Sequence, residues 1–143
     1  MDVGSRGSYP ANALSNFTAH GFMIEGVQCA SMEGFLQGLK FKSPEMQREI
    51  CSYIGRGAKK AGSKKNWQTS QILWWRSQDY QNLITDAFNC MYEQSDKFRA
   101  ALEDAGPKAV FTHSMGRHNE NETVLTEREF CSQLHRLQRR MFP

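Results

Sequence analysis

Three polar residues recur at helical spacing within the stretch SMEGFLQGLKF, residues 31–41. Glu33, Gln37 and Lys40 would lie along one side of an α-helix, because residues three and four positions apart share a helix face. A carboxylate can transfer a proton, and a lysine amine can attack a carbonyl carbon to form a Schiff base. The row therefore predicts acid–base or nucleophilic chemistry. Ordinary surface charges on a helix would give the same pattern, and the spacing alone leaves both interpretations open.

Gly34 and Gly38 form a second row beside the polar one. Each glycine costs about 1 kcal/mol relative to alanine in the interior of a helix. Such a cost is commonly offset by the close approach of another backbone or of a ligand. We therefore expect either a neighbouring element or a bound group to lie close to this side of the helix.

A basic, glycine-rich stretch follows, GRGAKKAGSKK at residues 55–65. It contains no acidic residue, and its cations and backbone N–H groups could hold a diphosphate. The residues concerned are Arg56, Lys59, Lys60, Gly62, Lys64 and Lys65. The alternative is a solvated loop that is basic by chance. The net charge of +3 permits an anionic ligand without demanding one.

Helix signals flank these candidate residues. Caps and apolar stripes predict helices over residues 31–40, 44–54, 77–93, 95–105 and 126–141. The second of these is expected to bury Met46, Ile50, Tyr53 and Ile54. FMIEGVQC, residues 22–29, predicts a β-hairpin with its turn at Glu25-Gly26, and residues 109–113 form a short β-like run. We expect a mainly α protein with one or two short β-hairpins, a single compact domain over residues 1–143, and an extended lead-in at residues 1–12.

Composition places the chain among globular proteins. Of its 143 residues, 39% are hydrophobic, 11% aromatic and 23% charged. No apolar run approaches the roughly 20 residues that a membrane span needs, and the first residues lack the apolar core of a signal peptide. The four cysteines include no C-x-x-C pair, which predicts reduced thiols in a cytoplasmic protein. Neither cysteines nor histidines show metal-ligand spacing.

Several motifs occur in an order that resembles the NADAR family, also called YbiA-like. They are LSNF (residues 14–17), the helix SMEGFLQGLKF, and AKKAG followed by NW (residues 58–67). The later stretch with ETVLTEREF (residues 122–130) is similar to one branch of the family, common among phage and bacterial members. Many other members end instead with Trp-Gly-x-Gly and Gly-x-Asn-x-Leu-Gly segments. Conclusions about substrates that are drawn from that second branch therefore apply less directly to this sequence. The resemblance covers residues 11–140.

The resemblance implies a mostly helical fold that cleaves an N-glycosidic bond at a ribose C1, with no metal and no cofactor. The implied substrate is ADP-ribose attached to a nucleobase, chiefly guanine in DNA, from which the modification is removed. A phosphorylated ribosylamino intermediate of riboflavin synthesis is the alternative substrate. A non-catalytic module that binds ADP-ribose or a nucleotide remains a third possibility. Neither a membrane nor an obligatory protein partner is implied.

The resemblance also suggests roles for individual residues. Glu33 would act as acid/base and Lys40 as the nucleophile that forms a Schiff base, or Glu33 would activate water directly while Lys40 acts only through its charge. The residues expected to bind substrate are Asn16, Phe17, Gln37, Arg56, Lys59, Lys65, Trp67, His113 and Thr123. Several of these have structural alternatives, since an asparagine can form a turn, a tryptophan can pack in the core, and a histidine can be held by ordinary hydrogen bonds.

Overall fold

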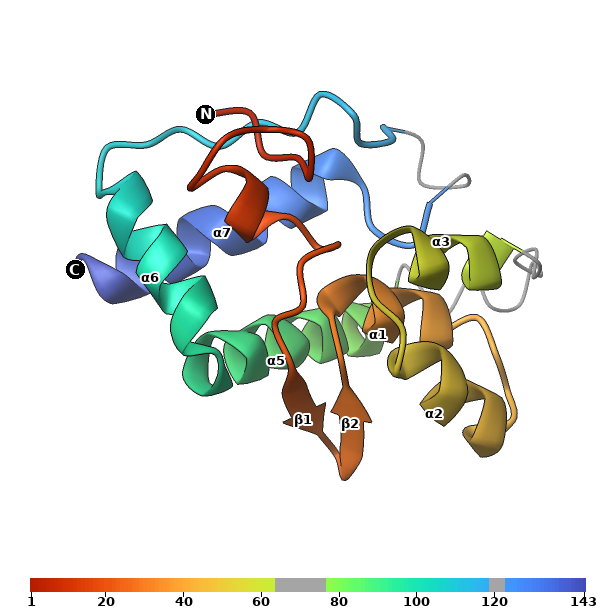
Figure 1. The fold of residues 1–143 in the computed structure, drawn as a ribbon. Helices are drawn as coiled ribbons and strands as arrows, with labels where there is room; N and C mark the ends of the chain where they lie inside the picture. Colours follow the sequence, from red (N-terminus) through yellow and green to blue (C-terminus); the bar gives the residue numbers. More distant parts are fainter. Residues whose placement is uncertain (64–76, 119–122) are drawn as a thin grey trace.

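The structure is a computed structural model that describes residues 1–63, 77–118 and 123–143. Its elements are η1 (Asn12–Leu14, a 3-10 helix), β1 (Phe22–Ile24), β2 (Val27–Cys29), α1 (Met32–Gly38), α2 (Pro44–Cys51), α3 (Gly55–Ser63), α5 (Gln78–Gln94), α6 (Asp96–Ala105) and α7 (Glu127–Met141). Helices α1, α2 and α3 gather on one side of the molecule, away from α6 and the C-terminus (Figure 1). This arrangement confirms the predicted mainly helical fold. In the part of the chain described, no helix is long and apolar enough to cross a membrane.

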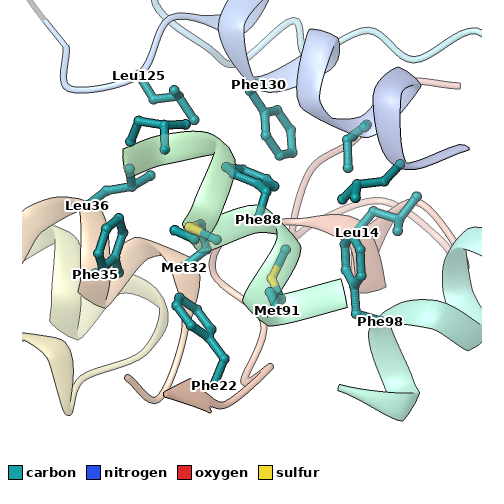
Figure 2. Close-up of a cluster of buried hydrophobic side chains, with 14 of the residues drawn as sticks. Leu14, Phe22, Met32, Phe35, Leu36, Phe88, Met91, Phe98, Leu125 and Phe130 are labelled. Carbon is teal, nitrogen blue, oxygen red and sulfur yellow. The ribbon is translucent and has the colours of Figure 1, made fainter. Parts of the chain in front are cut away.

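The core is organised around the long helix α5. Its buried side chains recur every three or four residues, as the sequence predicted, at Tyr80, Ile84, Ala87, Phe88 and Met91. Figure 2 shows Phe88 and Met91 of this helix together with buried side chains from the hairpin, α1, α6 and α7, namely Phe22, Met32, Phe98 and Phe130. The α5 helix therefore fixes where α1 lies relative to α7, two elements far apart in the sequence.

The predicted hairpin is confirmed. Strands β1 and β2 pair antiparallel, with Ile24 opposite Val27. Between them Glu25 has φ 49° and Gly26 has φ 79°, so both turn residues are left-handed, which suits a two-residue hairpin turn. The ring of Phe22 packs 6.0 Å from that of Phe35 on α1. The hairpin thus lies against α1 and supports the helix that carries the polar row.

Two helices end earlier than the sequence predicted. Helix α1 ends at Gly38, and Lys40 continues the turn through a bond from its N–H to the carbonyl of Gln37, 3.1 Å away. Helix α2 ends at Cys51, so it does not reach Ile54. Met46 and Ile54 are 38% and 48% exposed, and the prediction that they are buried was wrong. The physical reason is that α2 buries only Ile50 and Cys51, while most of its other residues face solvent.

The structure settles the form of two further segments. The basic stretch begins as a helix, α3, one of the two forms (a loop or a short helix) that its sequence allows. The β-like run near residue 110 makes an isolated parallel bridge, Asp2 with Thr112. The N-terminal residues consequently lie along residues 110–114, and Val3 belongs to the core at 1% exposure (Figure 1). Of the cysteines, Cys29 and Cys51 are buried thiols, while Cys90 and Cys131 are half-buried.

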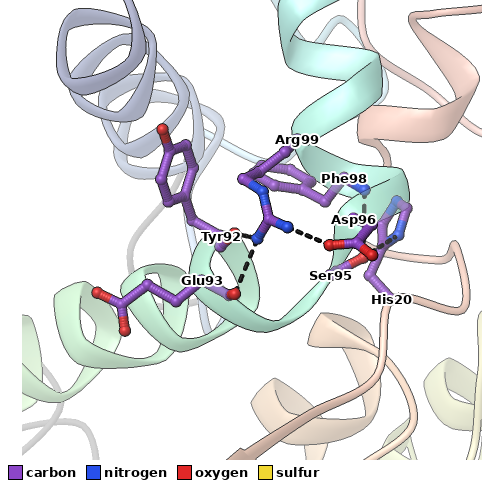
Figure 3. Close-up of polar contacts among 7 residues, drawn as sticks. All are labelled: His20, Tyr92, Glu93, Ser95, Asp96, Phe98 and Arg99. Atoms are coloured by element: carbon purple, nitrogen blue, oxygen red, sulfur yellow. Dashed lines mark hydrogen bonds and ion pairs between the residues drawn. The ribbon is translucent and has the colours of Figure 1, made fainter.

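A polar network joins α5 to α6. Ser95 accepts a hydrogen bond from the Phe98 N–H at 3.1 Å and so caps α6, as its sequence position predicted. Its hydroxyl also lies 3.0 Å from Nδ1 of the buried His20 (Figure 3). Arg99 donates to the last carbonyls of α5, at Tyr92 and Glu93, over 2.6 and 2.8 Å. These bonds fix the corner between the two helices.

Candidate active site

Hydrogen bonds anchor the start of α1 to two other segments, the turn after α2 and the segment that carries Asn16. Ser31 Oγ accepts a hydrogen bond from the Gly34 N–H at 3.0 Å and donates to the carbonyl of Tyr53 at 2.9 Å. The Glu33 N–H donates to the carbonyl of Asn16 at 3.0 Å. The predicted N-cap is therefore confirmed, and it also ties α1 to the turn after α2 and to the segment that carries Asn16. These bonds fix the start of α1 and therefore the direction in which the side chain of Glu33 points from the helix.

The two glycines of α1 make room for protein backbone. A Cβ atom at Gly34 would lie 2.6 Å from the carbonyl oxygen of Tyr53 and 3.0 Å from that of Cys51. A Cβ atom at Gly38 would lie 2.9 Å from Cys51 Sγ. The sequence left open whether a neighbouring element or a bound group lies against the glycine row. The structure places α2 and the turn that follows it there. The glycines serve helix packing, and through it they hold the polar row toward α3.

The predicted polar row is assembled on the side of α1 that faces α3. Gln37 Nε2 donates to Glu33 Oε1 over 2.9 Å, and Lys40 Nζ donates to the carbonyl of Gly62 over 3.3 Å. Gly62 is buried on α3, and a Cβ atom there would overlap Gln37 Oε1. The sequence suggests Gly62 as a source of backbone N–H groups for a diphosphate. In the fold its lack of a side chain is what allows Gln37 to reach Glu33.

Burial shifts the pKa values of Glu33 and Lys40 in opposite directions. It raises the pKa of Glu33, while the hydrogen bond from Gln37 and the charges of Lys59, Lys40 and His113 act to lower that pKa. Burial lowers the pKa of Lys40, and the charge of Lys59 lowers it further, against the opposing effect of Glu33. Both shifts favour the neutral forms, a carboxylic acid that can donate a proton and an amine that can act as a nucleophile.

Two oxygen atoms beside Glu33 are buried and accept no hydrogen bond from the described residues, Asn16 Oδ1 and Gln37 Oε1. Buried polar atoms in folded proteins nearly always have a partner, so an orphaned acceptor calls for an explanation. Both residues belong to the predicted substrate-binding set and both contact Glu33, one through its backbone and one through its side chain. The pair could accept hydrogen bonds from hydroxyl groups of a ligand.

Three other predicted residues, Phe17, Lys59 and Arg56, lie at or on helix α3 and differ in how close they come to the polar row. The carbonyl of Phe17 accepts the Gly55 N–H at 3.1 Å and so holds the beginning of α3. Lys59 is exposed on α3, and its charge reaches both Glu33 and Lys40. Arg56 is exposed on the first turn of α3. Thus α3 brings one cation of the basic stretch close to the row and leaves Arg56 on the surface.

His113 and Thr123 lie in the segments around the beginning of α7. The charge of His113 reaches Glu33, and its Nδ1 lies 2.6 Å from the carbonyl oxygen of Val3. Thr123 Oγ1 donates to the carbonyl of Leu125 over 3.1 Å. Thr126 forms the predicted capping box at the start of α7 with Glu129. Three further predicted residues, Lys64, Lys65 and Trp67, lie outside the described residues.

Sequence reasoning missed the parts of the site that come from elsewhere in the chain. It gave no role to Val3, whose carbonyl holds His113, because a backbone atom carries no sequence signal. It also missed the packing role of Gly116, where a Cβ atom would lie 2.5 Å from His113 Cδ2. A glycine three residues after a histidine suggests a turn, but not that the ring folds back over that turn.

Comparison with known proteins agrees with this architecture. Residues 8–139 match the family described as "Bacteriophage protein GP30.3". A protein of Enterobacteria phage T4, described as "Uncharacterized 17.1 kDa protein in Gp30-rIII intergenic region", is 35% identical over 146 residues, covering 96% of this chain and 95% of that protein. The NMR structure of the E. coli protein YbiA is similar with a TM-score of 0.63 over 94% of this chain and 80% of YbiA, at 18% identity. The YbiA match shows the fold, and the family and phage matches together show that the chain belongs to the bacteriophage GP30.3 protein family.

Proposed function

We propose that the protein is an N-glycosidase that removes ADP-ribose from ADP-ribosylated guanine bases in DNA. The observation that carries this proposal is the partly buried row on α1, in which Gln37 bonds Glu33 and Lys40 lies on the same side against α3. Cleavage at a ribose C1 requires a proton for the departing base and a group that captures the electron-poor carbon. Glu33 and Lys40 supply these two functions, and their pKa values are displaced in the directions that the functions require.

The reaction can be written in three steps. The C1–N bond breaks with its electron pair going to the base nitrogen, which takes the proton of the Glu33 carboxyl. The Lys40 amine bonds to C1 and gives a proton back to Glu33, and opening of the ribose ring leaves a Schiff base. Water then adds to the imine carbon, and departure of Lys40 releases ADP-ribose. In the competing mechanism the Glu33 carboxylate activates water directly, and Lys40 contributes only its charge.

The surroundings of the row support a ribose carrying a diphosphate. Asn16 Oδ1 and Gln37 Oε1, which lack a partner among the described residues, could accept hydrogen bonds from the ribose hydroxyls. Lys59 places a positive charge on the adjoining helix α3, where it could meet a phosphate. The mild positive charge of the whole chain favours a larger anionic substrate such as DNA.

The test is turnover of an oligonucleotide carrying ADP-ribosylated guanine. We expect the wild type to release ADP-ribose, and Glu33→Gln and Lys40→Ala to lose at least about 100-fold in kcat while still binding ADP-ribose. Glu45→Gln and Lys108→Ala are matched controls, because both residues are exposed on other elements. Binding of ADP-ribose without turnover by the wild type would instead support a binding module. Turnover of only a phosphorylated ribosylamine would support the small-metabolite alternative.

Trapping separates the two mechanisms. Borohydride reduces a Schiff base to a stable amine, so incubation with substrate and borohydride should add the mass of the reduced ADP-ribosyl group to the wild type. Lys40→Ala should remain unmodified and Lys108→Ala should react like the wild type. Absence of an adduct on a wild-type protein that still turns over its substrate excludes the Schiff base and leaves direct attack by water.

A further inference from the structure

A pocket of about 360 Å³ lies in the N-terminal part of the chain, around the segment that leads from η1 toward the hairpin. Its lining combines two aromatic rings with an amide and the hydroxyl groups of a serine and a threonine. Apolar walls with a few polar groups are typical of sites for small ligands. The lining residues are Ser5, Tyr9, Asn12, Ala13, Phe17 and Thr18.

Backbone hydrogen bonds place this pocket next to the start of the polar row. The carbonyl of Asn16 accepts the Glu33 N–H at 3.0 Å. The carbonyl of the next residue, Phe17, accepts the Gly55 N–H at 3.1 Å, so Phe17 lies at the beginning of α3. Since Phe17 also lines the pocket, two consecutive residues connect Glu33 of the row with the pocket and with the first turn of α3.

Helix α3 extends from the pocket to the other end of the row. Lys40 Nζ donates to the carbonyl of Gly62, and the chain from Gly55 to Gly62 is helical. At 1.5 Å per residue this part of α3 spans about 10 Å. Arg56 and Lys59 lie on the turns between, three positions apart and therefore on one side of the helix, and both are exposed. A ligand that reaches from Lys40 to the pocket follows a helix with cations that suit a diphosphate.

The amide of Asn12 gives the pocket a means of choosing between bases. Its Oδ1 is buried and accepts no hydrogen bond from the described residues. An amide carries an acceptor and a donor side by side, and half a turn of the group exchanges them. The edge of adenine with N6 and N7 presents a donor beside an acceptor, which one amide bonds at both positions. The same edge of guanine presents two acceptors, N7 and O6, so the amide pattern favours adenine.

The aromatic rings of the pocket suit the faces of a base, and their neighbours hold them in place. The hydroxyl of Tyr9 donates to Asp104 Oδ2 on α6 over 2.6 Å, although the residue is 56% exposed. Thr18 Oγ1 donates to the carbonyl of Asn12 over 2.9 Å and so fixes the backbone that carries the amide. Aromatic side chains stack on all bases alike. The rings therefore supply affinity, and the amide supplies selectivity.

We propose that this pocket binds the adenine of the ADP-ribosyl group, with the amide of Asn12 on its N6–N7 edge and the rings of Tyr9 and Phe17 against its faces. The assignment rests on the proposed function and deepens it, because it places the end of the ADP-ribosyl group farthest from the bond that breaks. The ribose whose C1 reacts then lies at the row on α1, and the diphosphate lies along α3.

Binding of free nucleotides tests the pocket without any turnover. Calorimetry compares ADP-ribose with inosine diphosphate ribose, in which an oxygen replaces the N6 amino group. We expect the wild type to bind the inosine compound about 10-fold more weakly, the order of discrimination that one amide–base pair provides. Asn12→Ala should bind both compounds equally weakly. Asn82→Ala, at an exposed asparagine of α5, is the matched control and should discriminate as the wild type does.

Two results of this comparison would overturn the assignment, equal binding of the two compounds by the wild type, or discrimination that persists in Asn12→Ala. Because Asn12 Oδ1 bonds no described residue, the alanine variant should keep the melting temperature of the wild type. Phe17→Leu is a second variant, and it should weaken the binding of both compounds by the same factor, about 10-fold, since stacking does not depend on the N6 group. Unchanged affinity of Phe17→Leu would also contradict the proposal.

Nuclear Overhauser effects locate the base in the wild type itself. We expect contacts from the adenine H2 and H8 protons to the ring protons of Tyr9 and Phe17. Contacts to other aromatic rings alone would place the base elsewhere and refute the pocket, as would a wild type that binds neither nucleotide.

The outcome is separable from that of the proposed function. Turnover of the ADP-ribosylated oligonucleotide with an unaltered KM in Asn12→Ala would refute the adenine pocket and leave the glycosidase in place. A wild type that discriminates between the two nucleotides through Asn12 but turns over no ADP-ribosyl substrate would refute the glycosidase and support the pocket.

Discussion

Glu33 and Lys40 illustrate at the scale of the residue how this site differs from a surface ion pair. Both groups lose solvation in the fold, and each is shifted toward its neutral form despite the attraction between them. A charge that is desolvated in this way destabilises the folded state at neutral pH. Such an arrangement sacrifices stability for reactivity, a trade that is common at functional sites.

Glu33→Gln should therefore stabilise the protein at pH 7. The folded-state pKa of Glu33 is raised, so its contribution to stability is present below the unfolded-state pKa and is lost as the pH rises. Glutamine cannot ionise, and its side-chain oxygen can still accept the bond from Gln37. We expect the free energy of unfolding to increase by about 1 kcal/mol, measured by urea denaturation at pH 7. Glu45→Gln, at an exposed position, should leave stability unchanged, and a lower stability of Glu33→Gln would contradict the proposed electrostatics.

At the scale of the element, the site depends on how closely three short helices approach one another. Gly34 and Gly38 bring α1 against α2, and Gly62 brings α3 against the polar row of α1. At each of these glycines, backbone or side-chain atoms of a neighbouring segment fill the space that a Cβ atom would occupy. The same packing desolvates the row, so the geometry and the pKa shifts have a common cause.

Gly62→Ala tests this close approach. Because a methyl group at this position would overlap Gln37 Oε1, Gln37 should be forced away from Glu33. We expect turnover to fall at least about 10-fold, and stability to fall by about 1–3 kcal/mol. Gly57→Ala is the matched control on the same helix, since nothing lies within 4 Å of its Cβ position, and it should be neutral or slightly stabilising. Equal behaviour of the two variants would show that α3 does not hold the row.

At the scale of the whole molecule, distant segments are joined by a few buried polar groups. His20 is one of them, with 2% of its surface exposed. Its Nε2 donates to the carbonyl of Ala13 over 2.5 Å, and its Nδ1 accepts from the hydroxyl of Ser95 at the corner of α5 and α6. Burial disfavours the charged form of this ring and lowers the pKa of His20, against the opposing effect of the bond to Ala13.

This contact should make stability depend on pH. A histidine whose folded-state pKa is lowered stabilises the fold fully above the unfolded-state pKa, and the contribution is lost as the pH falls below about 6.5. We expect the melting temperature to drop between pH 7.5 and pH 5, and the drop to be smaller in His20→Gln. His118→Gln, altered at an exposed histidine, should follow the wild type. If His20→Gln loses as much stability on acidification as the wild type, the buried histidine is not the cause.

Much of the fold could be predicted because its signals are local. The predicted caps at Ser31, Ser43, Ser95 and Thr126 all bond the N–H group three residues ahead, as their positions indicated. Helix ends were less predictable, as α1 and α2 show, because packing against a neighbour decides where a helix stops. The polar row on α1 could likewise be predicted from its spacing, whereas its protein neighbours could not.

The sequence by itself determined which side chains of α1 share a face, because helix geometry depends only on spacing along the chain. It also determined the chemical types available there, an acid, an amide and an amine. Only the tertiary structure decided their environment, since burial by α3 and the charges of Lys59 and His113 come from residues distant in the sequence. It also decided that the glycines of α1 admit α2, and that the carbonyl of Val3 holds the ring of His113. The physical reason is that pKa values and close contacts depend on distances through space, which the order of residues does not specify.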